Sequence, residues 1–252
     1  MKKLIYLLLA IATVACTSSK ESGCVKMDEE GTIEIAATRS DEVGDTTTEG
    51  RTKIATPAVE ELAVAISGNG ETFEWPTLAE FKKEAGRGLT FKTAPYTVTL
   101  SHGEKVEGVM VEGYGKPYFE GSTAVEVPGY GLSATAEVVV ALANSILAIT
   151  TTSNFDGYFQ QAPPKFTVRK IEWNAENAEM LFLNPGVATI ECVVVKPSGK
   201  EQTLTVDVEL KAQTRHTAVF DLPNAGSTEV TVKFDNEILE TKVEEFEMND
   251  EA

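Results

Sequence analysis

The alternation of apolar and polar residues predicts that most of this chain folds as β-strands. The clearest stretch is LTVDVEL (204–210), in which leucine or valine occupies every second position and polar residues fill the positions between. Successive side chains of a strand point to opposite faces, so this pattern gives one buried and one solvated face. The apolar run ECVVVK (191–196) is joined to it by PSGK, a sequence suited to a tight turn. These two segments are therefore predicted to form a β-hairpin.

Further segments follow the same rule. TIEIAAT (32–38) and YTVTL (96–100) alternate in the same way. VEVP and TAEVVVAL, both within 125–142, are expected to pair around GYGLS. EVTVKF and EILETKV, within 229–243, flank Asp235-Asn236, a plausible hairpin turn.

Helical signals are scarce. The best is TLAEFKKEAG (77–86), in which Thr77 is placed to cap the first turn and Leu78 and Phe81 share one face. Its two turns predict a connector rather than a core element. SNFDGYFQQ (153–161) is expected to form another short turn.

These features favour an all-β fold of two tandem antiparallel β-sandwiches over a parallel α/β sheet. The mature chain of roughly 235 residues is long for one sandwich and comfortable for two. EVVVALANSILAITTT runs one apolar strand into another with only ANS between, so we place the boundary there, giving domains 31–143 and 144–252. The polar segment 39–56 is too long for an ordinary loop and is expected to be an exposed, mobile excursion.

The N-terminus carries an export signal rather than a membrane span. Two lysines precede an apolar run (4–14) that is far below the roughly 20 residues needed to cross a bilayer. The run ends in TVAC, which resembles the bacterial lipobox, whose cysteine is acylated and becomes the new N-terminus. Residues 1–15 are therefore predicted to be a lipoprotein signal peptide, Cys16 to be lipidated, and residues 16–30 to be a flexible tether. The alternative is a secreted protein with an accidental Cys16.

The charge balance limits the partners. The chain holds 39 acidic residues against 22 basic ones, a net charge of −17. Such an acidic chain repels nucleic acid and anionic lipid headgroups, because both need Lys and Arg to neutralise their phosphates. We therefore exclude nucleic acid and expect membrane attachment through the lipidated Cys16, which holds well with two or more acyl chains. The predicted location is the outer membrane, with exposure at the cell surface; a periplasm-facing protein is the alternative.

Sequence signals for catalysis are missing. Neither of the two histidines, His102 and His216, has a second His or Cys at ligand spacing, so both are interpreted as surface residues and no metal site is predicted. No nucleophile elbow, phosphate-binding glycine loop or dinucleotide fingerprint occurs. Cys192 lies in a strand-like run and is expected to be a buried free thiol, with a bridge to Cys24 as the alternative. We predict no cofactor and no enzyme activity.

The most unusual segment is VEGYGKPYFEGSTAVEVPGYG (111–131), which concentrates aromatic residues among Gly and Pro. On exposed loops these rings could stack on sugars; in the favoured structural interpretation they cap a sandwich end. Together with both tryptophans they are the candidate ligand or partner contacts: Trp75, Tyr114, Tyr118, Phe119, Tyr130 and Trp173.

A resemblance to a known family rests on the lipobox followed in order by YTVTLSHGE, GYGKPYFEGS and AEVVVALANSILAIT. This arrangement resembles the Bacteroidetes lipoproteins that carry domain of unknown function 4493, and it covers about residues 31–168. The best matching pieces are Tyr96–Val98, Lys116–Gly121 and Leu142–Leu147. The family is similar in layout to fimbrillin-like proteins, which implies a lipidated N-terminus before two transthyretin-like sandwiches. The resemblance implies no catalytic or ligand residue.

Two functions from different classes follow. The leading hypothesis is a non-catalytic cell-surface lipoprotein with a structural or adhesive role, as the resemblance implies, acting as a fimbrial subunit, anchor or accessory with fimbrial or other surface proteins as partners. The alternative is a glycan-binding accessory surface lipoprotein that uses the aromatic residues as stacking platforms. An enzyme is the third and least favoured reading.

Overall fold

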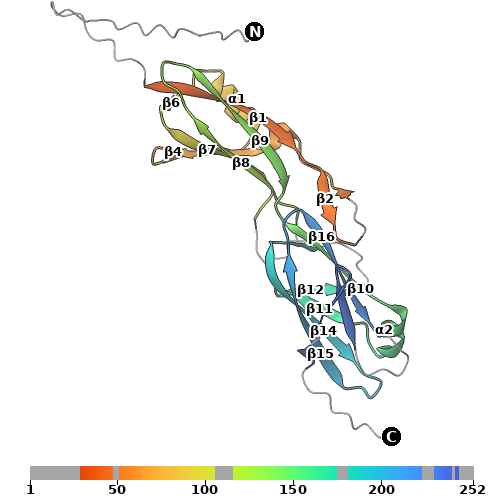
Figure 1. The fold of residues 1–252 in the computed structure, drawn as a ribbon. Helices are drawn as coiled ribbons and strands as arrows, with labels where there is room; N and C mark the ends of the chain where they lie inside the picture. The colour runs from red at the N-terminus through yellow and green to blue at the C-terminus, as the bar shows by residue number, and fades with distance from the viewer. Residues whose placement is uncertain are drawn as a thin grey trace, which may run out of the picture.

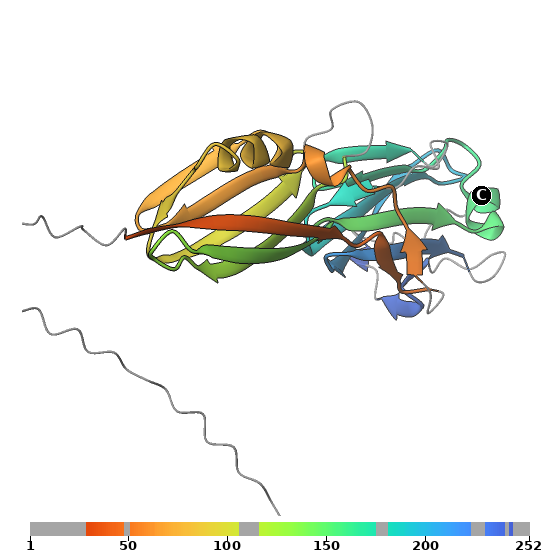
Figure 2. The ribbon, with the colours of Figure 1, turned by 90° about the horizontal axis from the view of Figure 1, so that it is seen from above.

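The fold is all-β, as the sequence predicts, and the described residues include two short α-helices and one 3-10 helix among the strands. The computed structural model describes residues 29–47, 51–105, 116–174, 181–222, 230–239 and 242–243. Figure 1 shows an elongated molecule in which the N-terminal strands lie at one end and the C-terminal strands at the other, and Figure 2 shows the same order from above. The tandem-sandwich division at residue 143 stays a prediction.

One sheet of seven strands gathers the N-terminal elements in the order β5-β4-β7-β8-β9-β1-β6. Neighbours in it are antiparallel except β1 and β9, which run parallel from Thr32↔Ser133 to Arg39↔Val140. Its strands are β1 (Glu30–Arg39), β4 (Ala63–Gly68), β5 (Glu71–Trp75), β6 (Phe91–Lys92), β7 (Pro95–His102), β8 (Phe119–Glu126) and β9 (Ser133–Leu142).

Two further sheets hold the C-terminal elements. The first follows the order β13-β10-β16-β17-β18, with β10 and β16 parallel, and it comprises β10 (Ser145–Thr151), β13 (Leu181–Leu183), β16 (Thr214–Asp221), β17 (Thr231–Phe234) and β18 (Glu237–Leu239). The second follows the order β12-β11-β14-β15-β19 and comprises β11 (Lys165–Val168), β12 (Ile171–Asn174), β14 (Gly186–Val195), β15 (Glu201–Leu210) and β19 (Lys242–Val243).

Two of the three predicted hairpins are confirmed. In the third, β8 and β9 pair at Phe119↔Leu142 and Glu120↔Ala141, so the expected pairing of VEVP with TAEVVVAL is not formed. Strands β14 and β15 pair antiparallel from Gly186↔Leu210 to Val195↔Glu201, and Gly199 in their turn has a φ of 84°. Strands β17 and β18 pair across Asp235 and Asn236, whose φ values are 51° and 71°. Positive φ at both central residues is what a two-residue hairpin turn of type I′ requires.

Helix α1 (Leu78–Ala85) is the predicted connector. The Thr77 side chain accepts a hydrogen bond from the Glu80 N–H at 3.2 Å, and Leu78 and Phe81 are the buried residues. Gly86 follows as the C-cap. The short turn expected at 153–161 is helix α2 (Ser153–Tyr158).

The buried apolar residues form two clusters rather than one. The first cluster, which we call the N-terminal core, includes Val98, Leu100, Val140 and Ile146. The second, the C-terminal core, begins with Leu147 and draws on both C-terminal sheets. Ile146 and Leu147, adjacent residues of β10, therefore belong to different cores, because successive side chains of a strand point to opposite faces.

The expectation for segment 39–56 is wrong for much of its length. Strand β2 (Glu42–Asp45) adds parallel to β16 with Gly44 opposite Thr214, and β3 (Arg51–Lys53) pairs with β2. We call residues 42–53 the strap. Val43 of the strap is only 1% exposed and packs in the N-terminal core, although its backbone neighbours belong to the C-terminal sheet. The strap therefore joins the two parts of the molecule.

Candidate functional site

Three of the six predicted contact residues point into the protein instead of out of it. Trp75 and Tyr118 are each 8% exposed, and Phe119 is 2% exposed. The Trp75 indole N–H donates to Glu84 Oε2 at 2.7 Å, and its ring meets Phe81 edge-on at 5.0 Å. Because neighbouring side chains cover these rings, they cannot act as stacking platforms for a sugar, and the structural interpretation fits them better.

Of the other three predicted contacts, Tyr130 is 66% exposed. It lies in the turn between β8 and β9 with a φ of 65°. Tyr114 lies outside the described residues, and of Trp173 only the backbone, in β12, is described. The candidates therefore do not gather into one aromatic platform among the described residues.

Tyr118 and Asn144 connect two motifs that the family resemblance singled out. The Tyr118 N–H donates to the Asn144 side-chain oxygen, and the Ala143 N–H donates to the Tyr118 carbonyl at 2.8 Å. On the other side, the Gln213 N–H donates to the Asn144 carbonyl at 2.9 Å, and the Ser145 hydroxyl donates to the Lys211 carbonyl at 2.7 Å. Asn144 is 5% exposed. We call this set of contacts the junction; it holds the end of β9 against the start of β16.

The phenol of Tyr118 is kept neutral. Its hydroxyl donates to Glu120 Oε2 at 2.6 Å. Burial first, and then the hydrogen bond and charge of Glu120, raise the pKa of Tyr118 to about 12. A phenol of this kind serves as a hydrogen-bond donor at neutral pH and not as an acid or base.

A buried histidine network is the feature that the sequence reading missed. His216 is 1% exposed, so its interpretation as a surface residue is wrong. The Lys211 N–H donates to its Nε2 at 2.9 Å, which assigns the ring proton to Nδ1, and Nδ1 lies 2.5 Å from Asp235 Oδ2. The signal was present, because alternation backwards from Phe220 through Ala218 places His216 on the inner face.

Asp235 links three parts of the chain. It accepts hydrogen bonds from the His216 ring, from the Thr217 N–H at 3.0 Å and from the hydroxyl of Thr46, which follows β2. Burial acts to raise the pKa of the Asp235 carboxyl, but these hydrogen bonds and the His216 ring outweigh it and hold the pKa below its usual range. A paired histidine and aspartate can serve in catalysis, yet here both histidine nitrogens are occupied by the protein's own groups. The network is thus a fastening for the strap.

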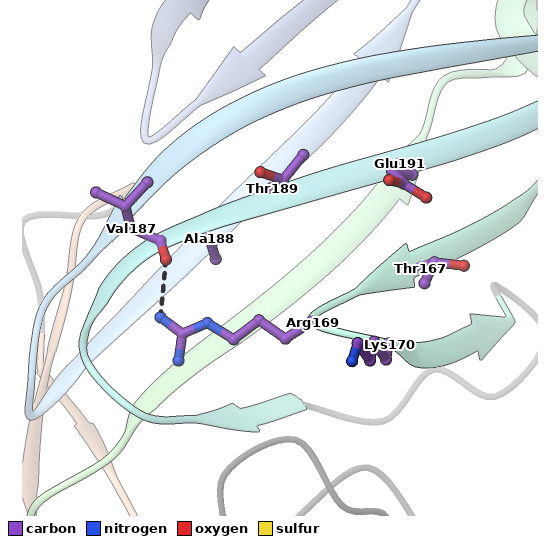
Figure 3. A pocket seen from close by; sticks show the side chains of 7 residues that line it. All are labelled: Thr167, Arg169, Lys170, Val187, Ala188, Thr189 and Glu191. Carbon is purple, nitrogen blue, oxygen red and sulfur yellow. Dashed lines mark hydrogen bonds between the residues drawn. The ribbon is translucent and has the colours of Figure 1, made fainter.

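A groove of about 350 Å³, lined by both polar and apolar groups, lies on the C-terminal part (Figure 3). The turn between β11 and β12 forms one end, where the Arg169 guanidinium donates to the carbonyls of Asn184 at 2.9 Å and Val187 at 3.0 Å. The side chains lining it are Thr167, Arg169, Lys170, Val187, Ala188, Thr189 and Glu191. Its hydroxyls and charges suit hydrogen bonding to a polar ligand, but it contains no aromatic ring.

The predictions for the cysteines and for metal binding can be compared with the structure only at the described residues. Cys192 is a buried free thiol, as predicted, and burial raises its pKa well above the usual range. Cys16 and Cys24 lie outside the described residues. Across the described part of the chain, no group of three or more His, Cys, Asp or Glu side chains is placed to hold a metal ion. None of the described helices is long and apolar enough to cross a membrane.

In a comparison with protein families, residues 29–250 match the domain of unknown function 4493. The chain belongs to this family. The match confirms the resemblance and extends it beyond residue 168, through the C-terminal sheets. The groove, the strap and the junction all lie inside the region that matches the family, residues 29–250.

Solved structures give weaker similarities. A fimbrial assembly protein from Parabacteroides distasonis is 9% identical, with a TM-score of 0.40, 86% of this chain covered and 99% of the other. A proposed cell adhesion protein from Bacteroides ovatus is 9% identical, with a TM-score of 0.39 and coverages of 86% and 99%. A fimbrial protein from Bacteroides ovatus is 8% identical, with a TM-score of 0.32 and coverages of 76% and 48%. No curated protein matches this family member significantly.

Proposed function

We propose that this protein is a non-catalytic lipoprotein of the outer membrane, exposed at the cell surface, with a structural or adhesive role. The role is that of a fimbrial subunit, anchor or accessory. The observation that carries the proposal is the end-to-end arrangement of the two cores, with β1 starting at one extremity (Figure 1). A lipid on Cys16, fourteen positions before Glu30, would place that extremity at the membrane and the C-terminal core away from it.

The contacts between the two cores support an elongated molecule that resists bending at the boundary between its two parts. The strap crosses from one core to the other, and its carbonyl at Glu42 accepts a hydrogen bond from the Gln213 side chain at 3.1 Å. The junction adds a second connection through Asn144. Two separate connections resist bending better than one linker does, which suits a protein that presents a surface at a distance from its anchor.

Protease treatment of intact cells tests this proposal. The wild-type protein should be digested from the cell surface, and the Cys16→Ala variant should be released from the membrane fraction. Cys24→Ala is the matched control, because it changes the other N-terminal cysteine and should leave attachment unchanged. A wild-type protein protected from protease would face the periplasm, and the adhesive role would then be rejected.

A glycan-binding accessory role is the second candidate, and the groove beside Arg169 is the feature that favours it. Hydroxyl and carboxylate groups such as those of Thr167, Thr189 and Glu191 recognise sugar hydroxyls through hydrogen bonds. A glycan array probed with the wild type and with Glu191→Ala tests it. Binding that Glu191→Ala abolishes would support this role, and an array without hits would reject it.

A further inference from the structure

The turn between β8 and β9 differs from the other tight turns of the protein. Its four residues, Gly129–Leu132, are closed by a hydrogen bond from the Leu132 N–H to the Gly129 carbonyl at 3.3 Å. Both central residues have positive φ, 65° at Tyr130 and 68° at Gly131, which makes it a type I′ turn. We call these four residues the tip turn. Asparagine is the residue that ordinarily precedes glycine in such a turn, because it tolerates this conformation better than tyrosine does.

In the comparable turns, the residue at the first central position, which Tyr130 holds in the tip turn, is explained by the turn itself or by its contacts. The second central position is also occupied by a non-glycine residue with positive φ in two of them, Lys170 (67°) and Asn236 (71°). The β4–β5 turn uses the preferred pair Asn69-Gly70. Asp235 begins the β17–β18 turn, and its carboxylate receives three hydrogen bonds. Arg169 begins the β11–β12 turn and donates to two carbonyls. Each of these residues stabilises the protein in which it lies.

Tyr130 has no such explanation inside the protein. Its side chain is 66% exposed and makes no hydrogen bond or ring contact with any other described residue. Leu132, two residues later, is 58% exposed. A large side chain kept in a costly conformation, without internal contacts, indicates a role outside the protein.

The tip turn lies beside the start of β1, the end of the described chain that leads back towards Cys16. The Gly131 N–H donates to the Glu30 carbonyl at 2.9 Å, and the Thr32 N–H donates to the Leu132 carbonyl at 3.0 Å, so the turn lies beside the start of β1. Figures 1 and 2 both show it at the extremity where β1 begins. The 14 steps from Cys16 to Glu30 span at most about 50 Å when fully extended, so a lipid-anchored protein keeps this extremity within that distance of the bilayer.

We propose that Tyr130 and Leu132 dock the tip turn onto the lipid surface in which Cys16 is anchored, and that this contact holds the rod upright. The inference rests on the proposed lipoprotein function. Tyrosine suits the membrane interface, because its ring enters the apolar boundary while its hydroxyl bonds headgroups. Two side chains are too few to bind a membrane alone, but the anchor raises their effective concentration at the surface.

The charges around the tip turn select the kind of lipid. Three acidic residues lie at this extremity: Glu30 at the start of β1, Glu71 after the β4–β5 turn and Glu126 at the end of β8. Lys92 of β6, which is in register with Glu30, is a cation at the same end. The excess of acids repels anionic headgroups. The docking surface is therefore a zwitterionic one, and anionic lipid should weaken the contact.

Fluorescence quenching on vesicles tests the docking. The full lipidated protein is reconstituted in phosphatidylcholine–phosphatidylethanolamine vesicles with and without brominated acyl chains, as wild type, Tyr130→Trp and Ile238→Trp. Ile238 is the matched control, since it is 71% exposed and lies on β18, in the C-terminal part. The emission of the added tryptophan is the difference between each variant and the wild type. The brominated chains should quench most of this emission in Tyr130→Trp and none of it in Ile238→Trp. Adding phosphatidylglycerol should reduce the quenching.

Each contrary result has a distinct meaning. Tyr130→Trp emission that stays unquenched while the protein floats with the vesicles overturns the docking and leaves the anchor in place. Equal quenching of both variants means that the molecule lies flat, which also overturns the docking. A wild-type protein that does not float with the vesicles overturns the lipoprotein proposal itself, and the docking with it. Tyr130→Asn on the same vesicles should leave flotation unchanged.

Discussion

The two ends of the N-terminal sheet are built in opposite ways. At the junction, where β9 ends, polar groups are buried and matched to one another through Asn144 and Tyr118. At the tip turn, where β9 begins, apolar groups are exposed and Tyr130 adopts a conformation that costs free energy. One end is thus built to bind the rest of its own chain, whereas the other is the end that we propose contacts a lipid surface.

If that comparison is right, changes beside the junction should be the most damaging. The Asp235→Ala variant should lose about 3 kcal/mol of unfolding free energy, because it removes the acceptor of three hydrogen bonds and leaves a buried histidine without its partner. Urea denaturation followed by circular dichroism measures the loss. Asp235→Asn is the control: it keeps an acceptor oxygen and should lose less. Equal stability of Asp235→Ala and the wild type would contradict the fastening role of the network.

Asn144→Ala should have the next largest effect. It leaves the Tyr118 N–H without its acceptor in a buried position, which costs about 1–3 kcal/mol. Asn144→Asp keeps the acceptor oxygen and should retain more of the stability. Limited proteolysis adds a specific readout, because loosening the junction should expose the chain around residues 143–145 before either core unfolds. Cleavage that starts inside a core instead would argue against a separate role for the junction.

The Asp235 network should also make stability depend on pH. The folded pKa of Asp235 lies below the pKa of aspartate in the unfolded chain, where it is about 3.9. Its contribution is therefore fully present above about pH 4 and is lost as the pH falls through the folded value. The difference in urea midpoint between the wild type and Asp235→Asn should shrink on going from about pH 5 to about pH 2. A difference that stays constant over that range would show that the ionised carboxylate contributes nothing.

Local features of the fold could be read from the sequence, and long-range ones could not. The hairpin that ends at Leu210 and the helix capped by Thr77 depend on alternation, turn residues and caps within about ten positions. The parallel pairing of β1 with β9 joins segments about a hundred residues apart, and neither strand carries a sign of its partner. The strap gives no signal for the same reason: among its described residues only Val43 is buried, so no alternation marks it.

The candidate site was predicted less well than the fold. Residue type alone does not separate a buried aromatic ring from an exposed one, whereas alternation places Phe119 and Trp75 at positions that the sheet buries. The missing second His or Cys at ligand spacing excludes a metal site at His216 but carries no information on burial, which the alternation of its strand does give. The groove depends on Arg169 reaching carbonyls 15 and 18 residues away, which spacing in the sequence cannot show.

The smallest expected effect is at the tip turn, and it is the sharpest test of the difference between the two ends of the sheet. The earlier variants should lower the free energy of unfolding, whereas this one should raise it. Tyr130→Asn should raise the unfolding free energy by about 0.5–1 kcal/mol, since asparagine adopts positive φ at lower cost and the exposed ring gives up no internal contact. Asn69→Tyr is the converse change, in the β4–β5 turn, and should destabilise by a similar amount. Thermal unfolding of the two variants beside the wild type measures both. If Tyr130→Asn lowers the melting temperature, then Tyr130 stabilises its own protein after all, and the tip turn is not a surface kept for a partner.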